Sequence, residues 1–163
     1  MQAQHWRVLE SPVQAFPQRQ ARIDALTKMQ DINRSDLSAF RARGGKLLMA
    51  HGTADVLVST RATQQYYQRM VQNMGAAAVR DFARYYEVPG YGHAVSGIYN
   101  AAWDSLATLD AWVVQGQAPQ AQVVEDTVGQ PGRTRPLCEY PSWPRYNGSG
   151  DVNAAESFRC VSE

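Results

Sequence analysis

The sequence predicts an α/β fold in which a short parallel sheet is flanked by helices and followed by an irregular tail rich in proline and glycine. The first observation behind this prediction is a short apolar run at residues 46–50, which is bounded by glycines and is typical of a buried strand. The second is a run at residues 82–88 that ends at Pro89-Gly90. Each run is followed by apolar residues at helical spacing. The order strand, helix, strand, helix is typical of a right-handed parallel unit.

These patterns divide the chain into three parts. Residues 1–34 are polar and weakly defined, with one modest helix expected at residues 19–32. Residues 35–119 hold the βαβα core. Residues 120–163 are rich in proline and glycine and have no sustained hydrophobic period. We therefore expect them to form an irregular tail that wraps around the core, not a second domain.

Helix ends in the core are marked by capping residues. The candidate N-caps of its three helices, in chain order, are Ser35, then Ser59 or Thr60, then Asn100. The last helix is expected to end before Gly116. Its expected apolar face consists of Ala102, Leu106, Leu109 and Val113.

Composition limits the classes of function. The chain has 163 residues, of which 44% are hydrophobic and 19% charged, and its net charge is +1. A balanced charge without a long basic run argues against a nucleic-acid partner. No apolar stretch approaches the roughly 18 residues that a membrane span needs, so we expect no membrane partner either. The first residues lack the pattern of a signal peptide. We expect no cofactor and no metal site.

Two side chains in strand-end loops are candidates for catalysis. Asp55 follows the first predicted strand and His93 follows the second. Neighbouring parallel strands bring such loops side by side, and functional residues gather at this edge of an open α/β sheet. A carboxylate beside an imidazole fixes its tautomer and stabilises the imidazolium. We therefore expect Asp55 and His93 within about 2.6–3.2 Å of each other, although either residue alone would more commonly be structural.

Other candidates are weaker. His51 precedes Gly52 at the strand end, and we interpret it as structural. The sequence contains no G-x-S-x-G nucleophile elbow. Ser149 lies between glycines but has no apolar strand before it, and Ser96 follows His93 too closely to be presented to it by a separate elbow.

The cysteines Cys138 and Cys160 both lie in the tail, 22 residues apart. Two cysteines are too few for a typical zinc site. Two free buried thiols remain an alternative. We favour a disulfide, because the tail has little apolar periodicity to hold it in place otherwise. A disulfide would indicate folding in an oxidising compartment.

Several separate motifs resemble the tannase/feruloyl esterase family over residues 33–160. They include Arg-Gly-Gly at residues 43–45, His51-Gly52 followed by Asp55, Pro-Gly-x-Gly-His at residues 89–93, Leu-Asp-Ala-Trp-Val at residues 109–113, and the tail with Cys138 and Cys160. The resemblance implies the C-terminal half of an α/β-hydrolase fold and a serine esterase acting on phenolic esters. It places Asp55 and His93 at the acid and base of the triad, and pairs Cys138 with Cys160.

Two departures from the family qualify this resemblance. Family members usually have a cysteine after the catalytic histidine, where this chain has Ala94. The serine, the oxyanion hole and the lid domain belong to upstream sequence in the family. We therefore expect a truncated hydrolase fragment without activity by itself. Two alternatives stay open: an active esterase, with an unusual nucleophile or completed by another chain, and a non-catalytic binding or assembly module.

The truncation carries two further expectations. The family resemblance suggests a secreted or periplasmic origin, but the absence of a signal peptide leaves the compartment of this chain open. The first strand would pair with upstream sequence in the whole fold, so an isolated chain would expose it. We expect a homodimer or larger homo-oligomer that buries it. The alternative is a cover formed by residues 1–34, through Trp6, Val8, Leu9 and Phe16.

Overall fold

The computed structural model describes residues 19–94 and 98–162. The chain divides into two units, residues 1–34 and residues 35–163. In the first unit the structure describes one helix, α1 (Gln20–Gln30), which contributes no buried residue. In the second unit, two strands, β1 (Leu47–Gly52) and β2 (Ala83–Val88), form a parallel pair. This pair holds the candidate site.

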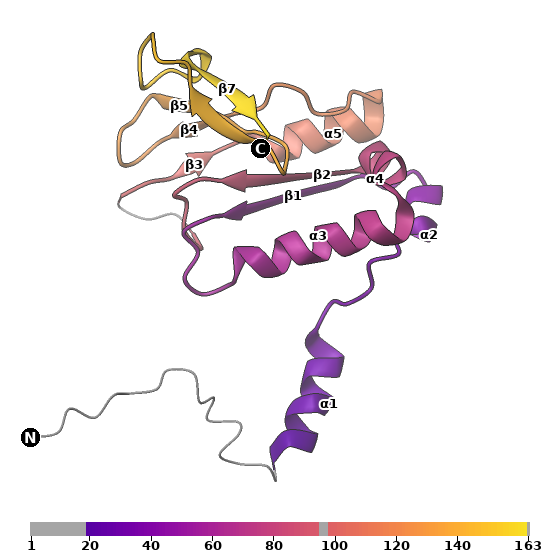
Figure 1. The fold of residues 1–163 in the computed structure, drawn as a ribbon. Helices are drawn as coiled ribbons and strands as arrows, with labels where there is room; N and C mark the ends of the chain where they lie inside the picture. Colours follow the sequence, from indigo (N-terminus) through magenta and orange to yellow (C-terminus); the bar gives the residue numbers. More distant parts are fainter. Residues whose placement is uncertain (1–18, 95–97, 163) are drawn as a thin grey trace, which may run out of the picture. The chain divides into compact units, whose positions relative to one another are not determined.

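The crossover between the two strands is helical, as the sequence predicts. It consists of α3 (Thr60–Met74), Gly75 and α4 (Ala76–Phe82), and α4 was not expected. Gly75 has φ +82°, a left-handed conformation that suits glycine and ends α3. Figure 1 shows α3 along one side of the β1–β2 pair and α5 (Ser105–Gln115) on the other. The parallel register runs from Leu47 opposite Ala83 to Gly52 opposite Val88.

Alternation along the strands builds a hydrophobic cluster on each face of the pair. On one face, Tyr85 packs with Tyr67 and Met70 of α3, and with Leu47 and Met49 of β1. The cluster on the other face contains Tyr86, Val88, Leu48, Trp103, Val124 and Leu137. The second cluster draws on the C-terminal region, so that region is part of the core.

Two predicted N-caps are wrong. The short helix α2 is limited to Ser38–Ala42, and the side chain that binds its first turn is Asp36, which accepts from the N–H of Ser38 at 2.9 Å. Ser35 is buried instead, and its Oγ accepts from Asn73 Nδ2 at 2.7 Å. The last helix, α5, begins at Ser105 because Asp104 accepts from the N–H of Ala107.

Asn100 lies before a strand, not a helix. The next two residues form β3 (Ala101–Ala102), which pairs with β4 (Val123–Asp126) in antiparallel orientation. The backbone N–H of Asn100 donates to the Oδ1 atom of Asp126 at 3.2 Å. The residues that local capping rules assign to the start of α5 therefore form a strand, because they pair with a distant segment.

The prediction of an irregular tail also needs correction. Residues 120–162 contain four short strands, namely β4, β5 (Arg133–Pro136), β6 (Trp143–Tyr146) and β7 (Phe158–Val161). Strands β4 and β5 join β3 in an antiparallel sheet with the order β3-β4-β5, and β6 and β7 form an antiparallel pair. A short 3-10 helix (Ala155–Ser157) precedes β7. Strands of four residues are too short to show a sustained hydrophobic period.

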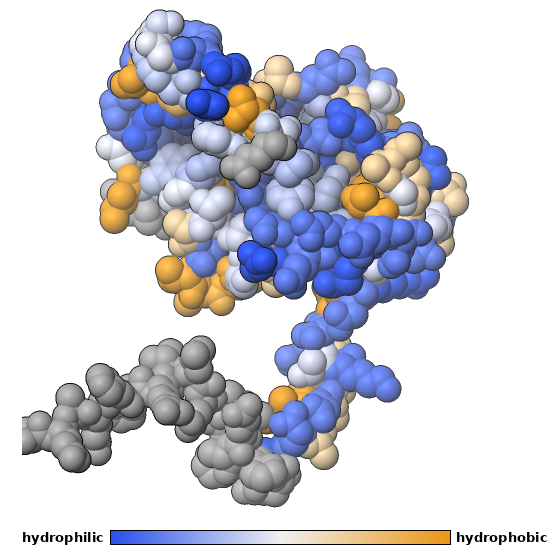
Figure 2. Space-filling model, in the orientation of Figure 1, coloured by the Kyte–Doolittle hydropathy of each residue, from blue (hydrophilic) through white to orange (hydrophobic). Residues whose placement is uncertain are grey.

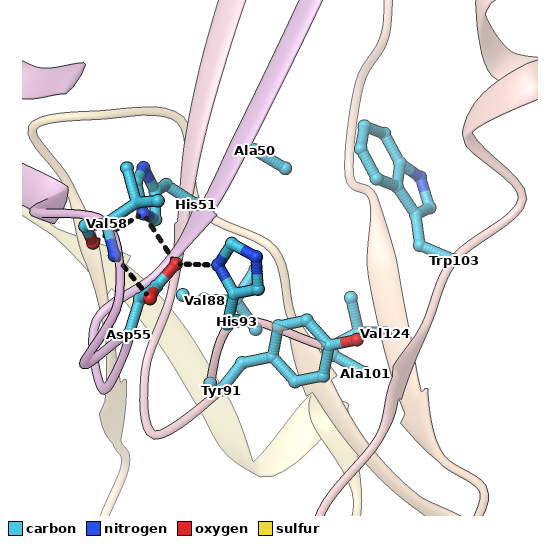
Figure 3. A pocket seen from close by; sticks show the side chains of 12 residues that line it. Ala50, His51, Asp55, Val58, Val88, Tyr91, His93, Ala101, Trp103 and Val124 are labelled. Carbon is cyan, nitrogen blue, oxygen red and sulfur yellow. Dashed lines mark hydrogen bonds and ion pairs between the residues drawn. The ribbon is translucent and has the colours of Figure 1, made fainter. Parts of the chain in front are cut away.

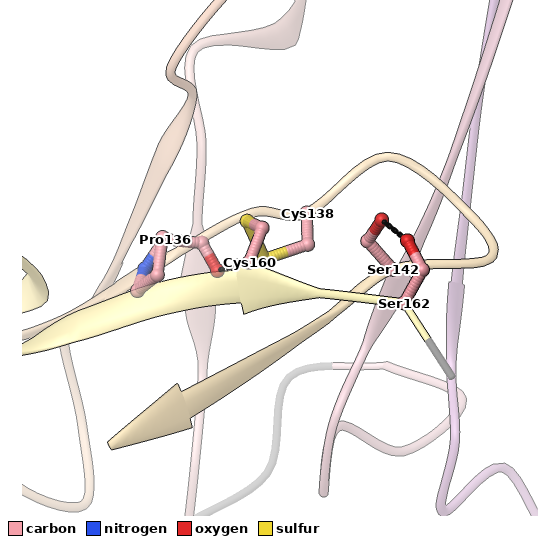
Figure 4. Close-up of a disulfide and its surroundings, with 5 residues drawn as sticks. All are labelled: Pro136, Cys138, Ser142, Cys160 and Ser162. Atoms are coloured by element: carbon pink, nitrogen blue, oxygen red, sulfur yellow. Dashed lines mark hydrogen bonds between the residues drawn. A yellow bond between two sulfur atoms is a disulfide. The ribbon is translucent and has the colours of Figure 1, made fainter. Parts of the chain in front are cut away.

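The Cys138–Cys160 disulfide is present, which confirms that prediction, and its Cα atoms are 5.6 Å apart. Cys138 follows β5 and Cys160 lies in β7, so the bond ties the β6-β7 pair to the segment beside the core (Figure 4). That segment is itself attached to β2, because the N–H of Tyr140 donates to the carbonyl oxygen of Tyr85 at 2.8 Å.

A buried carboxylate organises the loops around β4. Asp126 accepts four backbone hydrogen bonds, from Asn100, Val128, Gly129 and Gln130, and one from the guanidinium of Arg133 at 2.6 Å. Burial alone would raise the pKa of Asp126. The backbone donors outweigh it and hold the pKa of this carboxyl well below its usual range. Asp126 thus binds the backbone at Asn100, which follows the His93 loop in the chain.

Replacing the disulfide tests its contribution to stability. We expect Cys160→Ser to lower the free energy of unfolding by about 3 kcal/mol, because the bond closes a loop of roughly twenty residues. Denaturant unfolding of the oxidised proteins measures this difference. Ser162→Ala is the matched control, since Ser162 lies two residues away and its hydroxyl bonds to that of Ser142. Equal stability of Cys160→Ser and the parent protein would contradict the expectation.

The Asp126 carboxylate predicts an acid-sensitive contribution to stability. A pKa that is lower in the folded than in the unfolded chain stabilises the fold above the ordinary carboxyl pKa of about 3.9. This stabilisation is lost as the pH falls below that value. We expect Asp126→Asn to lower the melting temperature at pH 7 by about 5 °C or more and to flatten its dependence on pH between pH 5 and 2. Asp110→Asn, on the exposed side of α5, should do neither.

The free edge of β1 predicts association of the 163-residue chain. Within the described residues β1 pairs only with β2, and Ala50 is exposed. We expect a homodimer or larger assembly in sedimentation at tens of micromolar. A charged side chain on an edge strand opposes pairing, so Ala50→Lys should shift the protein towards monomer, whereas Gln72→Lys on α3 should not.

A stable parent monomer would contradict the homo-oligomer and favour the N-terminal cover. The residues of that cover, Trp6, Val8, Leu9 and Phe16, lie outside the described residues.

Candidate functional site

The candidate site lies where β1 and β2 end, because parallel pairing brings both carboxyl ends to the same edge of the sheet. Asp55 comes three residues after β1 and His93 five residues after β2. Backbone hydrogen bonds join the two loops directly, from the N–H of Thr53 to the oxygen of Val88 and from the N–H of Ala54 to the oxygen of Tyr91, each at 3.0 Å.

Gly52 is what allows the loops to approach so closely. A Cβ atom at this position would lie 2.1 Å from the carbonyl oxygen of Tyr91, a backbone atom that cannot move aside without shifting the His93 loop. Glycine is the residue that permits such an approach of two backbones. The His-Gly-x-x-Asp spacing therefore has a structural reason as well as a chemical one.

Asp55 and His93 make the contact that the sequence predicts. Asp55 Oδ2 lies 3.0 Å from His93 Nδ1. The other carboxylate oxygen, Oδ1, accepts from the N–H groups of Leu57 and Val58, each at 2.9 Å. The Asp55 side chain is only 4% exposed.

These partners hold the pKa of Asp55 well below its usual range. The N–H of Val58 contributes most, and burial of the carboxyl acts in the opposite direction. The N–H of Leu57 and the rings of His93 and His51 lower the pKa further. Asp55 is consequently an anion at neutral pH and can serve as a fixed acceptor for an imidazole N–H.

One ring nitrogen of His93 faces Asp55 and the other does not. Its Nδ1 faces Asp55, and Figure 3 shows its second ring nitrogen on the side away from that carboxylate. The side chain is 49% exposed, in contrast to Asp55. An imidazole whose Nδ1–H is held by a carboxylate presents Nε2 as a base. Among the described residues, Asp55 is the side chain hydrogen-bonded to His93, and Ser96 lies outside them.

A cavity of about 270 Å³ lies beside His93. Its wall is mostly apolar and is formed by Ala50, Val58, Val88, Ala101, Trp103 and Val124 (Figure 3). The loop between β1 and α3 adds an exposed apolar rim consisting of Val56, Leu57 and Val58, visible as an orange patch in Figure 2. The half-exposed side chain of His93 thus lies near apolar surface.

His51 makes a contact with Asp55 that we did not predict from the sequence. We interpreted it as structural, yet its Nε2 lies 3.1 Å from Asp55 Oδ2, the same oxygen that binds His93. Strand alternation puts its side chain on the face of Met49 and towards α3. The spacing of four residues from Asp55 was visible in the sequence, but it does not show how the loop turns back.

In residues 19–94 and 98–162, no group of three or more His, Cys, Asp and Glu side chains is arranged to hold a metal ion. In the same residues, every helix is too short or too polar to cross a bilayer.

Comparison with known proteins gives sequence matches over most of the chain. An uncharacterised esterase of Agrobacterium fabrum is 41% identical over 145 residues, which cover 86% of this chain and 26% of that protein. Mono(2-hydroxyethyl) terephthalate hydrolase of Piscinibacter sakaiensis is 44% identical over 132 residues, which cover 78% of this chain and 22% of that protein. The chain thus spans about a quarter of the length of these relatives.

Comparison of the fold with solved structures also points to esterases. The structure of feruloyl esterase B from Aspergillus oryzae is similar with a TM-score of 0.74 and 25% identity, covering 84% of this chain and 32% of that one. The helices and small sheets described above are therefore consistent with part of an α/β-hydrolase-like fold. The family model described as tannase and feruloyl esterase matches residues 6–161. On this evidence the chain belongs to the tannase and feruloyl esterase family.

Proposed function

We propose that this chain is the part of a serine carboxylic ester hydrolase that carries the acid and base of the triad, and that it hydrolyses no ester by itself. The observation that carries the proposal is the 3.0 Å contact between Asp55 Oδ2 and His93 Nδ1 at the carboxyl edge of a parallel strand pair. The nucleophilic serine and the oxyanion hole would come from another segment, upstream in the same protein or on a second chain.

The chemistry assigned to the pair is proton transfer. The Nε2 atom of His93 would take the proton of the serine hydroxyl as the serine oxygen attacks the ester carbonyl. Asp55 would stabilise the resulting imidazolium without becoming protonated. His93 would then give the proton to the departing alcohol as the ester bond breaks. In the second half, His93 would activate water, which releases the acid and regenerates the serine.

The substrate class we propose is an ester of an aromatic acid. Two kinds of support point to it. The wall of the cavity beside His93 is mostly apolar and includes the indole of Trp103. Two of the similar proteins are named for terephthalate and feruloyl esters, whose acid parts are both aromatic.

Surfaces of the second unit support the need for a completing segment. Leu106, Val113 and Val114 of α5 are exposed although they are apolar, and β1 has a free edge within the described residues. Exposed apolar side chains on one helix and a free strand edge can mark a contact with another part of a protein. A non-catalytic assembly module is the second candidate, because it would use the same surfaces.

A complementation assay tests the proposal. The 163-residue chain alone should not hydrolyse a chromogenic phenolic ester. Fused behind the part of the Agrobacterium fabrum esterase that precedes its matched region, it should do so. In that fusion we expect His93→Ala and Asp55→Asn each to lower kcat by about 10³-fold or more, because serine activation depends on both groups.

Ser149→Ala is the matched control for the assay, since Ser149 is the serine of the Gly-Ser-Gly run and should have no effect. Turnover by the parent chain alone that disappears in His93→Ala would contradict the proposal and indicate a nucleophile within the chain. Stable binding to a completing segment without turnover would favour the assembly module.

A further inference from the structure

Every polar atom of the His51 ring has a partner. Its Nδ1 lies 2.7 Å from the hydroxyl oxygen of Thr63, and its Nε2 lies 3.1 Å from Asp55 Oδ2 and 3.3 Å from the carbonyl oxygen of Val58. The side chain is 11% exposed. Thr63 belongs to the first turn of α3 and His51 to β1, so two regular elements position the ring.

These partners determine the tautomer of His51. A carboxylate and a carbonyl oxygen can only accept hydrogen bonds, so Nε2 must carry the proton. In the neutral ring Nδ1 then has a lone pair and accepts from the hydroxyl of Thr63. The result is a directed chain in which Thr63 donates to His51 and His51 donates to Asp55.

With His51 included, each oxygen of Asp55 has two donors. Leu57 and Val58 bind Oδ1, and His51 and His93 bind Oδ2. The two N–H groups on Oδ1 belong to the loop of Asp55 itself. His93 lies outside any helix or strand and is half exposed. Of the two imidazoles on Oδ2, His51 is therefore the one that is held by a strand and a helix.

We propose that His51 is a positioning residue for the Asp55–His93 pair. By donating a second hydrogen bond to Oδ2, it fixes the rotation of the carboxylate so that the remaining lone pair of that oxygen faces His93 Nδ1. This inference rests on the proposed function for its catalytic meaning, but the arrangement itself is a property of this chain. Thr63 supports it by hydrogen-bonding to Nδ1, which holds the ring in place.

Carbon-detected NMR of the 163-residue chain tests the proposal without any hydrolysis. In His51→Leu we expect the pKa of Asp55 to rise by at least about half a pH unit, because the carboxylate loses one of its four donors. We also expect the Nδ1 proton of His93 to exchange faster with water. In His51→Gln the amide N–H₂ can replace the Nε2–H donor, so both observables should stay near their values in the parent chain.

Thr63→Val provides a variant that leaves the imidazole in place. It removes the hydroxyl that hydrogen-bonds to Nδ1, so the ring loses one of its anchors, while ¹⁵N shifts of His51 should still report the neutral form with the proton on Nε2. The exchange rate of the His93 Nδ1 proton should lie between those of the parent chain and His51→Leu. If His51→Leu fails to fold, the exchange rate of the His93 Nδ1 proton in the other two variants still tests the proposal. Faster exchange in Thr63→Val than in His51→Gln would support it, and equal rates in the two variants would overturn it.

An unchanged Asp55 titration in His51→Leu would overturn the proposal. So would equal changes in His51→Gln and His51→Leu, since these would indicate loss of packing instead of loss of a donor. In the active fusion, His51→Leu should lower kcat more than it alters KM, and His51→Gln should recover most of kcat. The NMR result stands whether or not the fusion hydrolyses esters, so failure of the positioning role can be told from failure of the proposed function.

Discussion

Parallel pairing of β1 with β2 in one register is the constraint on which the candidate site depends. Because Gly52 lies opposite Val88, the two strands end together and their loops leave the sheet side by side. A shift of one residue would turn the side chain of His51 to the opposite face of the strand. The same shift would remove Gly52 from the point where the backbone of Tyr91 approaches it. Register and site chemistry are therefore specified by the same few residues.

Local sequence was sufficient to predict the elements around this pair. The two strand runs, the long helix that ends at Gly75 and the contact between Asp55 and His93 follow from short-range patterns and from the rule that parallel strands end at one edge. The disulfide was predicted because the tail lacked a sustained hydrophobic period.

Predictions failed where a distant partner decided the outcome. Asn100 and Asp104 are both good N-caps by local rules, and pairing of β3 with β4 excludes the first of them. The tail forms strands because each short segment finds an antiparallel neighbour, which no hydrophobic period reveals. The contact of His51 with Asp55 was not foreseen for a related reason, since it depends on a loop that returns to place Asp55 within hydrogen-bonding distance of the ring.

The contrast between Asp55 and His93 shows how the proposed acid–base pair is built. Asp55 is almost fully buried, and its carboxylate oxygens receive four hydrogen bonds from within residues 51–93. His93 is half exposed, with its second ring nitrogen facing away from the carboxylate. The pair is therefore ordered by contacts inside this chain, and the exposed side of His93 is what a serine would have to approach. A segment that supplies the nucleophile needs to place a hydroxyl correctly, but it does not need to organise the base.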